Sequence, residues 1–178
     1  MVIGLRPNKG GFLRPFGCGW FIRQFLLGNG PEDSTRINPE TGATQSDINY
    51  QYKEALARAT ARERSEKIIS DMVLSGADVT EEDAERILQH QLKRVSRKFT
   101  HMRYHSFLMY FGVLKRLEWV ETTGDSEAST IQDNYPAAPS RVYYRLTEKG
   151  KNADDDLWSN PLFTLYPEIG PSHLKRSE

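Results

Sequence analysis

Two histidines, one cysteine and a run of three aspartates are the side chains of this sequence best suited to metal or nucleophilic chemistry. His101 and His105 are four residues apart, as two metal ligands on one helix face would be, but Met102 stands where the H-E-x-x-H motif has glutamate. Cys18 lies between glycines and has no evident partner base. The aspartates at 154–156 would point in different directions from a helix. We therefore expect no metal site and a buried, unreactive Cys18.

Other catalytic signals are missing from the sequence. It contains no phosphate-binding loop, no G-x-S-x-G motif and no paired-carboxylate motif. We therefore expect neither an enzyme nor a cofactor. No apolar run approaches the ~20 residues that cross a bilayer, so no membrane partner is expected. A single cysteine precludes an intramolecular disulfide and suits a reducing compartment, which predicts a cytoplasmic protein.

The charges are balanced in number but segregated along the chain. The sequence has 24 basic and 24 acidic side chains, so its overall charge does not indicate nucleic acid. Residues 1–31 and 86–117, however, contain arginines and lysines and no acid, whereas acids gather around 78–85, 121–133 and 154–156. Such segregation permits a basic face on a neutral protein.

The spacing of apolar residues predicts the elements that must position these side chains. We expect helices over 16–27, 46–75, 81–95 and 101–117, with Thr44 or Ser46 capping the second. Short strands are expected at 119–122 and 141–146, separated by a long flexible connection at 123–140. Thr147 is placed to cap a further helix directly after the second strand.

Two segments carry a resemblance to a known family. YFGVLKRLEWVE at 110–121 and YYRLTEKG at 143–150 resemble the recognition-helix end and the wing of winged helix-turn-helix proteins. The matching residues are Leu114, Leu117, Glu118, Tyr144, Leu146, Thr147 and Gly150. The resemblance covers roughly residues 80–155. It implies a mostly α fold with a small β-hairpin wing and, here, extra helices on the N-terminal side.

The resemblance leaves two pairings of helices open. The helix-turn-helix is formed either by 81–95 with 101–117, or by 46–59 with 101–117, in which case 60–98 are an inserted helical excursion. The expected division is an arm, short helix and loop at 1–43, a winged-helix domain with its extension at 44–157, and a tail at 158–178. Asp125, Glu127 and Asp133 would make the wing acidic and a poor minor-groove reader.

The resemblance also implies a function, which is double-stranded DNA binding by a transcriptional regulator or DNA-organising factor. The 101–117 helix would enter the major groove, and homodimerisation is a further family expectation, with 46–75 as the candidate surface. The competing hypothesis is a protein–protein interaction module in a larger assembly, without DNA contact. The candidate DNA-binding residues are Arg97, Lys98, His101, Met102, Arg103, His105, Ser106, Met109, Lys115 and Arg116.

Overall fold

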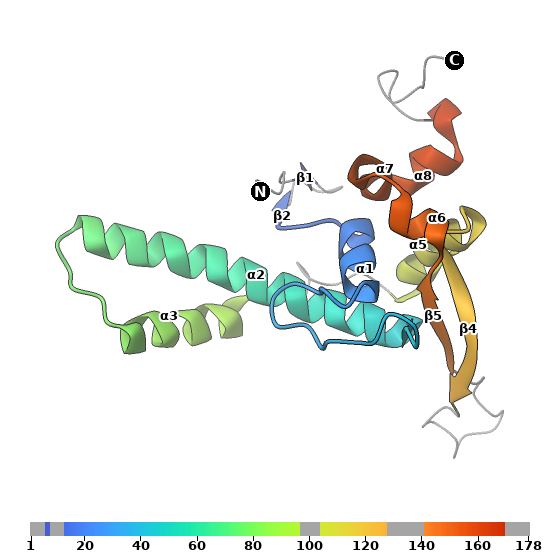
Figure 1. The fold of residues 1–178 in the computed structure, drawn as a ribbon. Coiled ribbons are helices and arrows are strands. Elements are labelled where there is room, and N and C mark those ends of the chain that lie inside the picture. The colour runs from blue at the N-terminus through green and yellow to red at the C-terminus, as the bar shows by residue number, and fades with distance from the viewer. Residues whose placement is uncertain (1–5, 8–12, 97–103, 128–140, 170–178) are drawn as a thin grey trace. The chain divides into compact units, whose positions relative to one another are not determined.

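The computed structural model describes residues 6–7, 13–96, 104–127 and 141–169. Over these ranges the protein is mostly helical, with a small three-stranded antiparallel sheet and a separate pair of two-residue strands. It divides into two compact units (Figure 1). The sheet unit comprises Gly17–Tyr52 and Met102–Glu178, and the extension unit comprises Met1–Phe16 and Lys53–His101.

The elements follow the order that the sequence predicts, with additions. The extension unit contains β1 (Arg6–Pro7), β2 (Leu13–Arg14), most of α2 (Gln45–Leu74) and α3 (Glu81–Arg94). The sheet unit contains α1 (Cys18–Leu26), β3 (Ala43–Thr44), the start of α2, α5 (Tyr104–Arg116), β4 (Val120–Glu127), β5 (Arg141–Leu146), α6 (Glu148–Asn152), α7 (Asp155–Ser159), α8 (Pro161–Leu165) and the 3-10 turn η1 (Pro167–Ile169).

The three-stranded sheet has the order β3-β5-β4, with both neighbouring pairs antiparallel. β3 pairs Ala43 with Tyr144 and Thr44 with Tyr143, so it lies along the far side of β5 from β4. The sequence predicts the end of a loop at this segment, so the strand is a correction. Two residues carry no alternating pattern, and only their distant partner in β5 reveals them.

The first strand of the β-hairpin is longer than expected. The sequence predicts a strand at 119–122 followed by a loop, whereas β4 continues to Glu127, so residues 123–127 correct that prediction. Their partners in β5 explain the extension, because Ser126 pairs with Val142 and Glu127 with Arg141 beyond a register shift. Gly124, with φ of +90°, lies in that shift. The remainder of the predicted loop, 128–140, lies outside the described residues.

The predicted buried face of α5 is confirmed. Phe107, Phe111 and Leu114 are fully buried. The ring of Phe111 meets that of Tyr144 in β5 edge-on at 5.0 Å and that of Phe107 at 5.8 Å. Aromatic rings prefer such offset and edge-on arrangements at these separations. α5 is thereby fixed against the sheet, and its opposite face is left for solvent or a ligand.

The junction between β5 and α6 has no loop. Leu146 is buried, and the Thr147 hydroxyl accepts a hydrogen bond from the Gly150 backbone N–H at 3.0 Å, which caps α6 as predicted. The same hydroxyl donates to the carbonyl of Glu118 at 2.6 Å. Glu118 lies two residues beyond α5 and has a φ of +59°. One threonine therefore joins the end of α5 to the start of α6.

The C-terminal helix α7 packs against α1, α6 and the segment before β4. Trp158 of α7 is fully buried, its ring packs at a tilt of 38° against that of Trp119 with centroids 4.7 Å apart, and its indole N–H donates to the Gly150 carbonyl at 2.9 Å. Arg23 of α1 forms an ion pair with Asp155 of α7. These contacts tie the first and last parts of the sheet unit together.

The long helix α2 begins at the sheet and continues into the extension unit. The Thr44 hydroxyl accepts a hydrogen bond from the Asp47 backbone N–H at 3.2 Å, so Thr44 is the cap. Tyr52 is buried and its ring lies 5.3 Å from that of Phe21 in α1. The other residues of the predicted apolar stripe, Ile48, Ala55, Leu56 and Ala59, are also buried. The helix ends at Leu74, close to the predicted bound.

α3 begins at a capping box formed by Thr80 and Asp83. The Thr80 hydroxyl accepts from the Asp83 backbone N–H at 3.2 Å and the Asp83 carboxylate accepts from the Thr80 backbone N–H at 3.3 Å. Hydrogen bonds from the Thr80 hydroxyl and N–H hold the pKa of Asp83 below its ordinary value. None of the side chains of α3 is buried.

Candidate nucleic-acid interface

The exposed face of α5 presents one row of residues along its length. His105, Met109, Gly112 and Arg116 follow each other at spacings of four, three and four, which places them on one stripe of a helix. The side chains of His105 and Arg116 are exposed, and Met109 is 62% exposed. Ser106 is exposed beside the row. We call these five residues the α5 face.

Two cations at the C-terminal end of α5 rest on aromatic rings. The Lys115 ammonium lies 5.7 Å from the ring centroid of Tyr144. The Arg116 guanidinium donates to the Tyr166 hydroxyl at 2.8 Å and lies 5.8 Å from that ring's centroid. Within the described ranges neither cation is paired with a carboxylate. Both charges are therefore oriented by the fold and not neutralised by it.

Gly112 is a member of the α5 face that the sequence analysis does not single out. It lies inside α5, where a glycine costs roughly 0.5–1 kcal/mol relative to alanine. Apart from the backbone of its own helix, a Cβ added at Gly112 would meet no atom of the described residues within 4 Å. Packing among these residues therefore gives no reason for a glycine at this position. A close approach by another molecule would give one, and the sequence signal is a glycine within a helical pattern.

Five of the ten predicted DNA-binding residues can be placed. His105, Ser106 and Met109 lie near the N-terminal end of α5, and Lys115 and Arg116 lie at its other end. The remaining predicted residues, Arg97, Lys98, His101, Met102 and Arg103, lie outside the described residues. α5 thus brings two predicted phosphate contacts and three predicted base contacts onto one helix.

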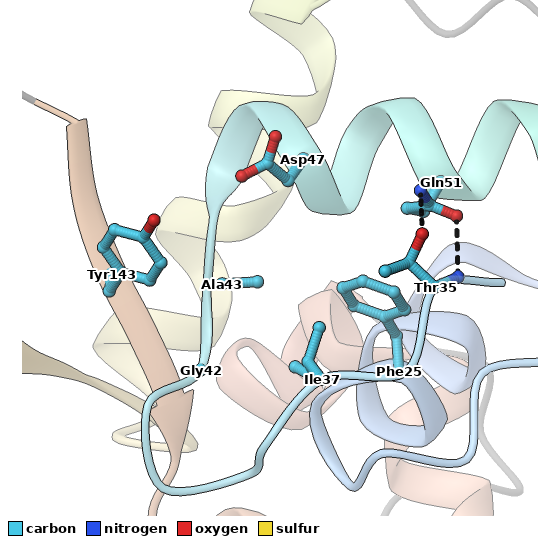
Figure 2. Close-up of a pocket in the computed structure, with 8 residues that line it drawn as sticks. All are labelled: Phe25, Thr35, Ile37, Gly42, Ala43, Asp47, Gln51 and Tyr143. Carbon is cyan, nitrogen blue, oxygen red and sulfur yellow. Dashed lines mark hydrogen bonds between the residues drawn. The ribbon is translucent and has the colours of Figure 1, made fainter. Parts of the chain in front are cut away.

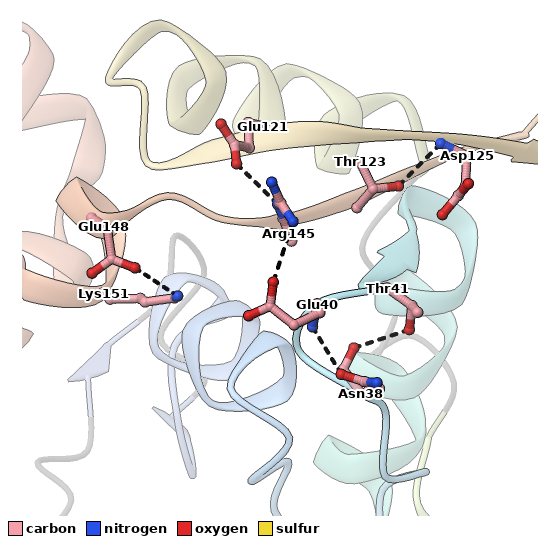
Figure 3. Close-up of polar contacts among 9 residues, drawn as sticks. All are labelled: Asn38, Glu40, Thr41, Glu121, Thr123, Asp125, Arg145, Glu148 and Lys151. Carbon is pink, nitrogen blue, oxygen red and sulfur yellow. Dashed lines mark hydrogen bonds and ion pairs between the residues drawn. The ribbon is translucent and has the colours of Figure 1, made fainter.

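The β-hairpin differs from α5 because its arginines are paired with carboxylates. Arg145 of β5 bridges Glu121 of β4 at 2.9 Å and Glu40 at 3.3 Å, as Figure 3 shows. Arg141 lies 3.5 Å from Glu127. These pairs are partly exposed and each contributes little stability, on the order of 0–1 kcal/mol. Their main effect is electrostatic, because Glu121 and Glu127 of β4 offset the charges of the two arginines of β5, while Asp125 leaves the two strands net acidic.

A tyrosine and a lysine extend this pattern of internal pairing. The Tyr143 hydroxyl donates to the Glu127 carboxylate at 3.1 Å, which raises the pKa of Tyr143. The Lys151 ammonium donates to Glu148 at 2.8 Å (Figure 3), which raises the pKa of Lys151. Both groups keep their ordinary charge at neutral pH. The hairpin and α6 therefore offer no free cation among these residues.

A shallow pocket of about 270 Å³ lies beside β3 (Figure 2). Gln51 and Thr35 on one side of the pocket form two hydrogen bonds with each other. The Thr35 backbone N–H donates to the Gln51 side-chain carbonyl at 3.2 Å, and the Gln51 side-chain NH₂ donates to the Thr35 hydroxyl at 3.0 Å. The Asp47 carboxylate accepts a hydrogen bond from the Thr44 hydroxyl at 2.6 Å. Because these polar groups are engaged with one another, the pocket lacks the convergent polar groups of a small-molecule site.

The chain was compared with protein-family models, with curated proteins and with solved structures. No family model, no curated protein and no solved structure matches it. Among the described residues, no helix has the length and apolar character needed to span a bilayer. In the same ranges, no three His, Cys, Asp or Glu side chains are grouped as metal ligands would be, and Cys18 is buried.

Proposed function

We propose that the sheet unit is a winged helix that binds double-stranded DNA through the α5 face. The support for the fold is the chain order of α1, β3, α2, α5, β4 and β5 together with the strand order β3-β5-β4. A helix, a short strand, two helices and a two-stranded wing follow one another in the winged-helix arrangement. On this assignment α2 and α5 form the helix-turn-helix, and the rest of α2 with α3 is an insertion.

The pairing of β3 with β5 favours this choice between the two helix pairs left open by the sequence. β3 directly precedes α2, so the start of α2 belongs to the same unit as the sheet and α5. α3 belongs to the extension unit. The second helix of the motif is therefore the start of α2.

The observation that carries the function is the combination of an outward α5 face with two oriented cations, Lys115 and Arg116, that no carboxylate of the described residues pairs. In the proposed complex α5 lies in the major groove. Lys115 and Arg116 contact phosphates, which set register and affinity, while His105, Ser106 and Met109 face base edges. Histidine, serine and methionine are weaker base readers than arginine or asparagine. A DNA-organising factor or a regulator of modest sequence preference fits these side chains.

The β-hairpin, whose described strands carry more acids than bases, favours a second candidate, a protein-interaction module without DNA contact. Arg141 and Arg145 are committed to carboxylates, so the wing supplies few charges for phosphates. A hairpin whose arginines are paired with its own carboxylates would suit a scaffold in a larger assembly. The two candidates differ in what contacts the α5 face, and DNA-binding measurements on variants of that face separate them.

We expect Gly112→Ala to stabilise the protein while it weakens DNA binding. Alanine is the better helix former, so the free energy of unfolding should rise by about 0.5–1 kcal/mol, because Gly112 has free space around it. The added methyl group would hold DNA away from α5, and we expect an affinity loss of about tenfold, or about 1.4 kcal/mol. Urea unfolding and fluorescence anisotropy with duplex DNA measure the two effects.

The matched control is Ser70→Ala, another gain in helix propensity at an exposed position of α2. It should stabilise the protein and leave DNA affinity unchanged. If Gly112→Ala binds duplex DNA as tightly as the parent protein, the α5 face is not the contact surface.

A further inference from the structure

α3 carries an apolar stripe that the described part of the chain does not cover. Its residues are each partly exposed and none is buried, whereas the rest of the helix surface is mostly exposed. A helix of 14 residues is marginal in water unless tertiary packing covers its apolar face. The stripe consists of Ala84, Ile87, Leu88, Gln91, Leu92 and Val95.

The neighbouring part of α2 has the same character. The chain turns at Gly76, which has a φ of +88°, and α3 follows in the same extension unit as the distal part of α2 (Figure 1). Val73 and Leu74, just before the turn, are 55% and 83% exposed. Ile68, Ile69 and Met72 are partly exposed. Helical domains cover apolar faces of this kind with further helices.

The charges of α3 identify what would complete it. Its first turn is acidic, with Glu81, Glu82 and Asp83, and its last turn is basic, with Lys93 and Arg94. If a second α3 packs antiparallel on the stripe, each acidic turn faces the basic turn of the other copy. The helix dipoles then also oppose each other. A parallel arrangement would bring like charges together at both ends.

We propose that the extension unit is a self-association surface, on which two copies of this chain pack α3 against α3 in an antiparallel pair. The two-fold axis passes near Ile87 and Leu88, at the middle of the stripe. Such an isologous contact is the commonest way in which soluble proteins form dimers. Together with the two α2 segments, the pair forms a four-helix arrangement that covers the stripe. This proposal does not depend on DNA binding by α5.

The first test is the mass of the full chain in solution, measured by sedimentation equilibrium or by light scattering after gel filtration. We expect twice the chain mass of 20.4 kDa at micromolar concentration. Leu88→Glu places a charge in the stripe and should give 20.4 kDa. His90→Glu places the same charge on the exposed side of α3 and should remain a dimer. A parent protein that stays monomeric at all concentrations overturns the proposal.

A charge exchange keeps the test decisive if Leu88→Glu unfolds the helix. One variant carries Glu81→Lys with Glu82→Lys, and the other carries Lys93→Glu with Arg94→Glu. Each alone should dimerise at least tenfold more weakly than the parent, because like charges then meet at both ends. An equimolar mixture should form heterodimers, since one α3 is then basic and the other acidic at both ends. A mixture that associates no better than the separate variants contradicts α3 pairing.

Discussion

Replacing Trp158 with alanine is expected to lower the free energy of unfolding by about 3–5 kcal/mol, the range for a buried large-to-small change. Trp158 is fully buried, and its ring packs at a tilt against that of Trp119 with centroids 4.7 Å apart. Its indole N–H satisfies the buried carbonyl of Gly150 at 2.9 Å. The substitution therefore removes apolar packing, opens a cavity and leaves that carbonyl without its partner.

Two glycines show how closely the backbone packs around this tryptophan. A Cβ at Gly150 would clash with the carbonyl of Trp119, and a Cβ at Gly19 would clash with the carbonyl of Trp158. α1 therefore meets α7, and α6 meets the segment before β4, with backbone close to backbone. Urea unfolding followed by circular dichroism measures the loss. Leu162→Ala, at a residue 43% exposed in α8, is the control and should cost much less. Equal losses for both variants would mean that Trp158 is not a core residue.

The second large effect is expected for Gly42→Ala. Gly42 has a φ of +69°, which costs a residue with a side chain about 1–3 kcal/mol. The added Cβ would also clash with the backbone carbonyl of Tyr144, and overpacking of this kind costs about 1–3 kcal/mol. We therefore expect a total loss of about 2–6 kcal/mol. The strain falls where β3 joins β5, so the third strand of the sheet should be the first part lost.

Gly124→Ala is the matched control for this effect. Gly124 has a φ of +90°, but a Cβ there meets nothing within 4 Å. It should therefore cost only the backbone term, about 1–3 kcal/mol. Hydrogen exchange at the amides of β5 checks the location, because loss of β3 exposes that side of the strand. If the two variants lose the same stability, the close approach of Gly42 to Tyr144 is not a determinant of the fold.

Local sequence patterns predict the helices well. The helical spacing of Ile48, Tyr52 and Leu56 depends only on neighbouring turns, and all three side chains are buried. The capping residues Thr44, Thr80 and Thr147 act within three residues of themselves, so they too can be recognised locally. Such features require no knowledge of distant contacts.

β5 has the bounds that the sequence predicts, but the existence of β3 and the length of β4 depend on partners far away in the sequence and are therefore missed. β3 has two residues and is defined by Tyr143 and Tyr144, about one hundred residues later. β4 extends beyond its expected end because Glu127 pairs with Arg141 of β5, in the strand register and through an ion pair. The sequence shows these charges, but it does not show which acid lies beside which arginine.

The candidate site likewise has features that local sequence patterns predict and features that depend on distant contacts. The outward positions of His105, Ser106 and Met109 follow from helical periodicity, and their exposure confirms that part of the prediction. The contact of Arg116 with Tyr166 joins residues 50 apart, and no local pattern indicates it. The open space around Gly112 is likewise a property of the folded chain. DNA binding itself remains a proposal.

The measurement that tests DNA binding most directly is fluorescence anisotropy of a random-sequence duplex, repeated across salt concentrations. We expect affinity to fall steeply with salt, because each neutralised phosphate releases counterions. Arg116→Ala should weaken binding and reduce the slope of log K against log salt by about one. Arg86→Ala removes an equal charge from α3, where Arg86 pairs with Asp83, and should leave the slope unchanged. A folded protein that binds no duplex at low salt would contradict the proposal and favour the protein-interaction module.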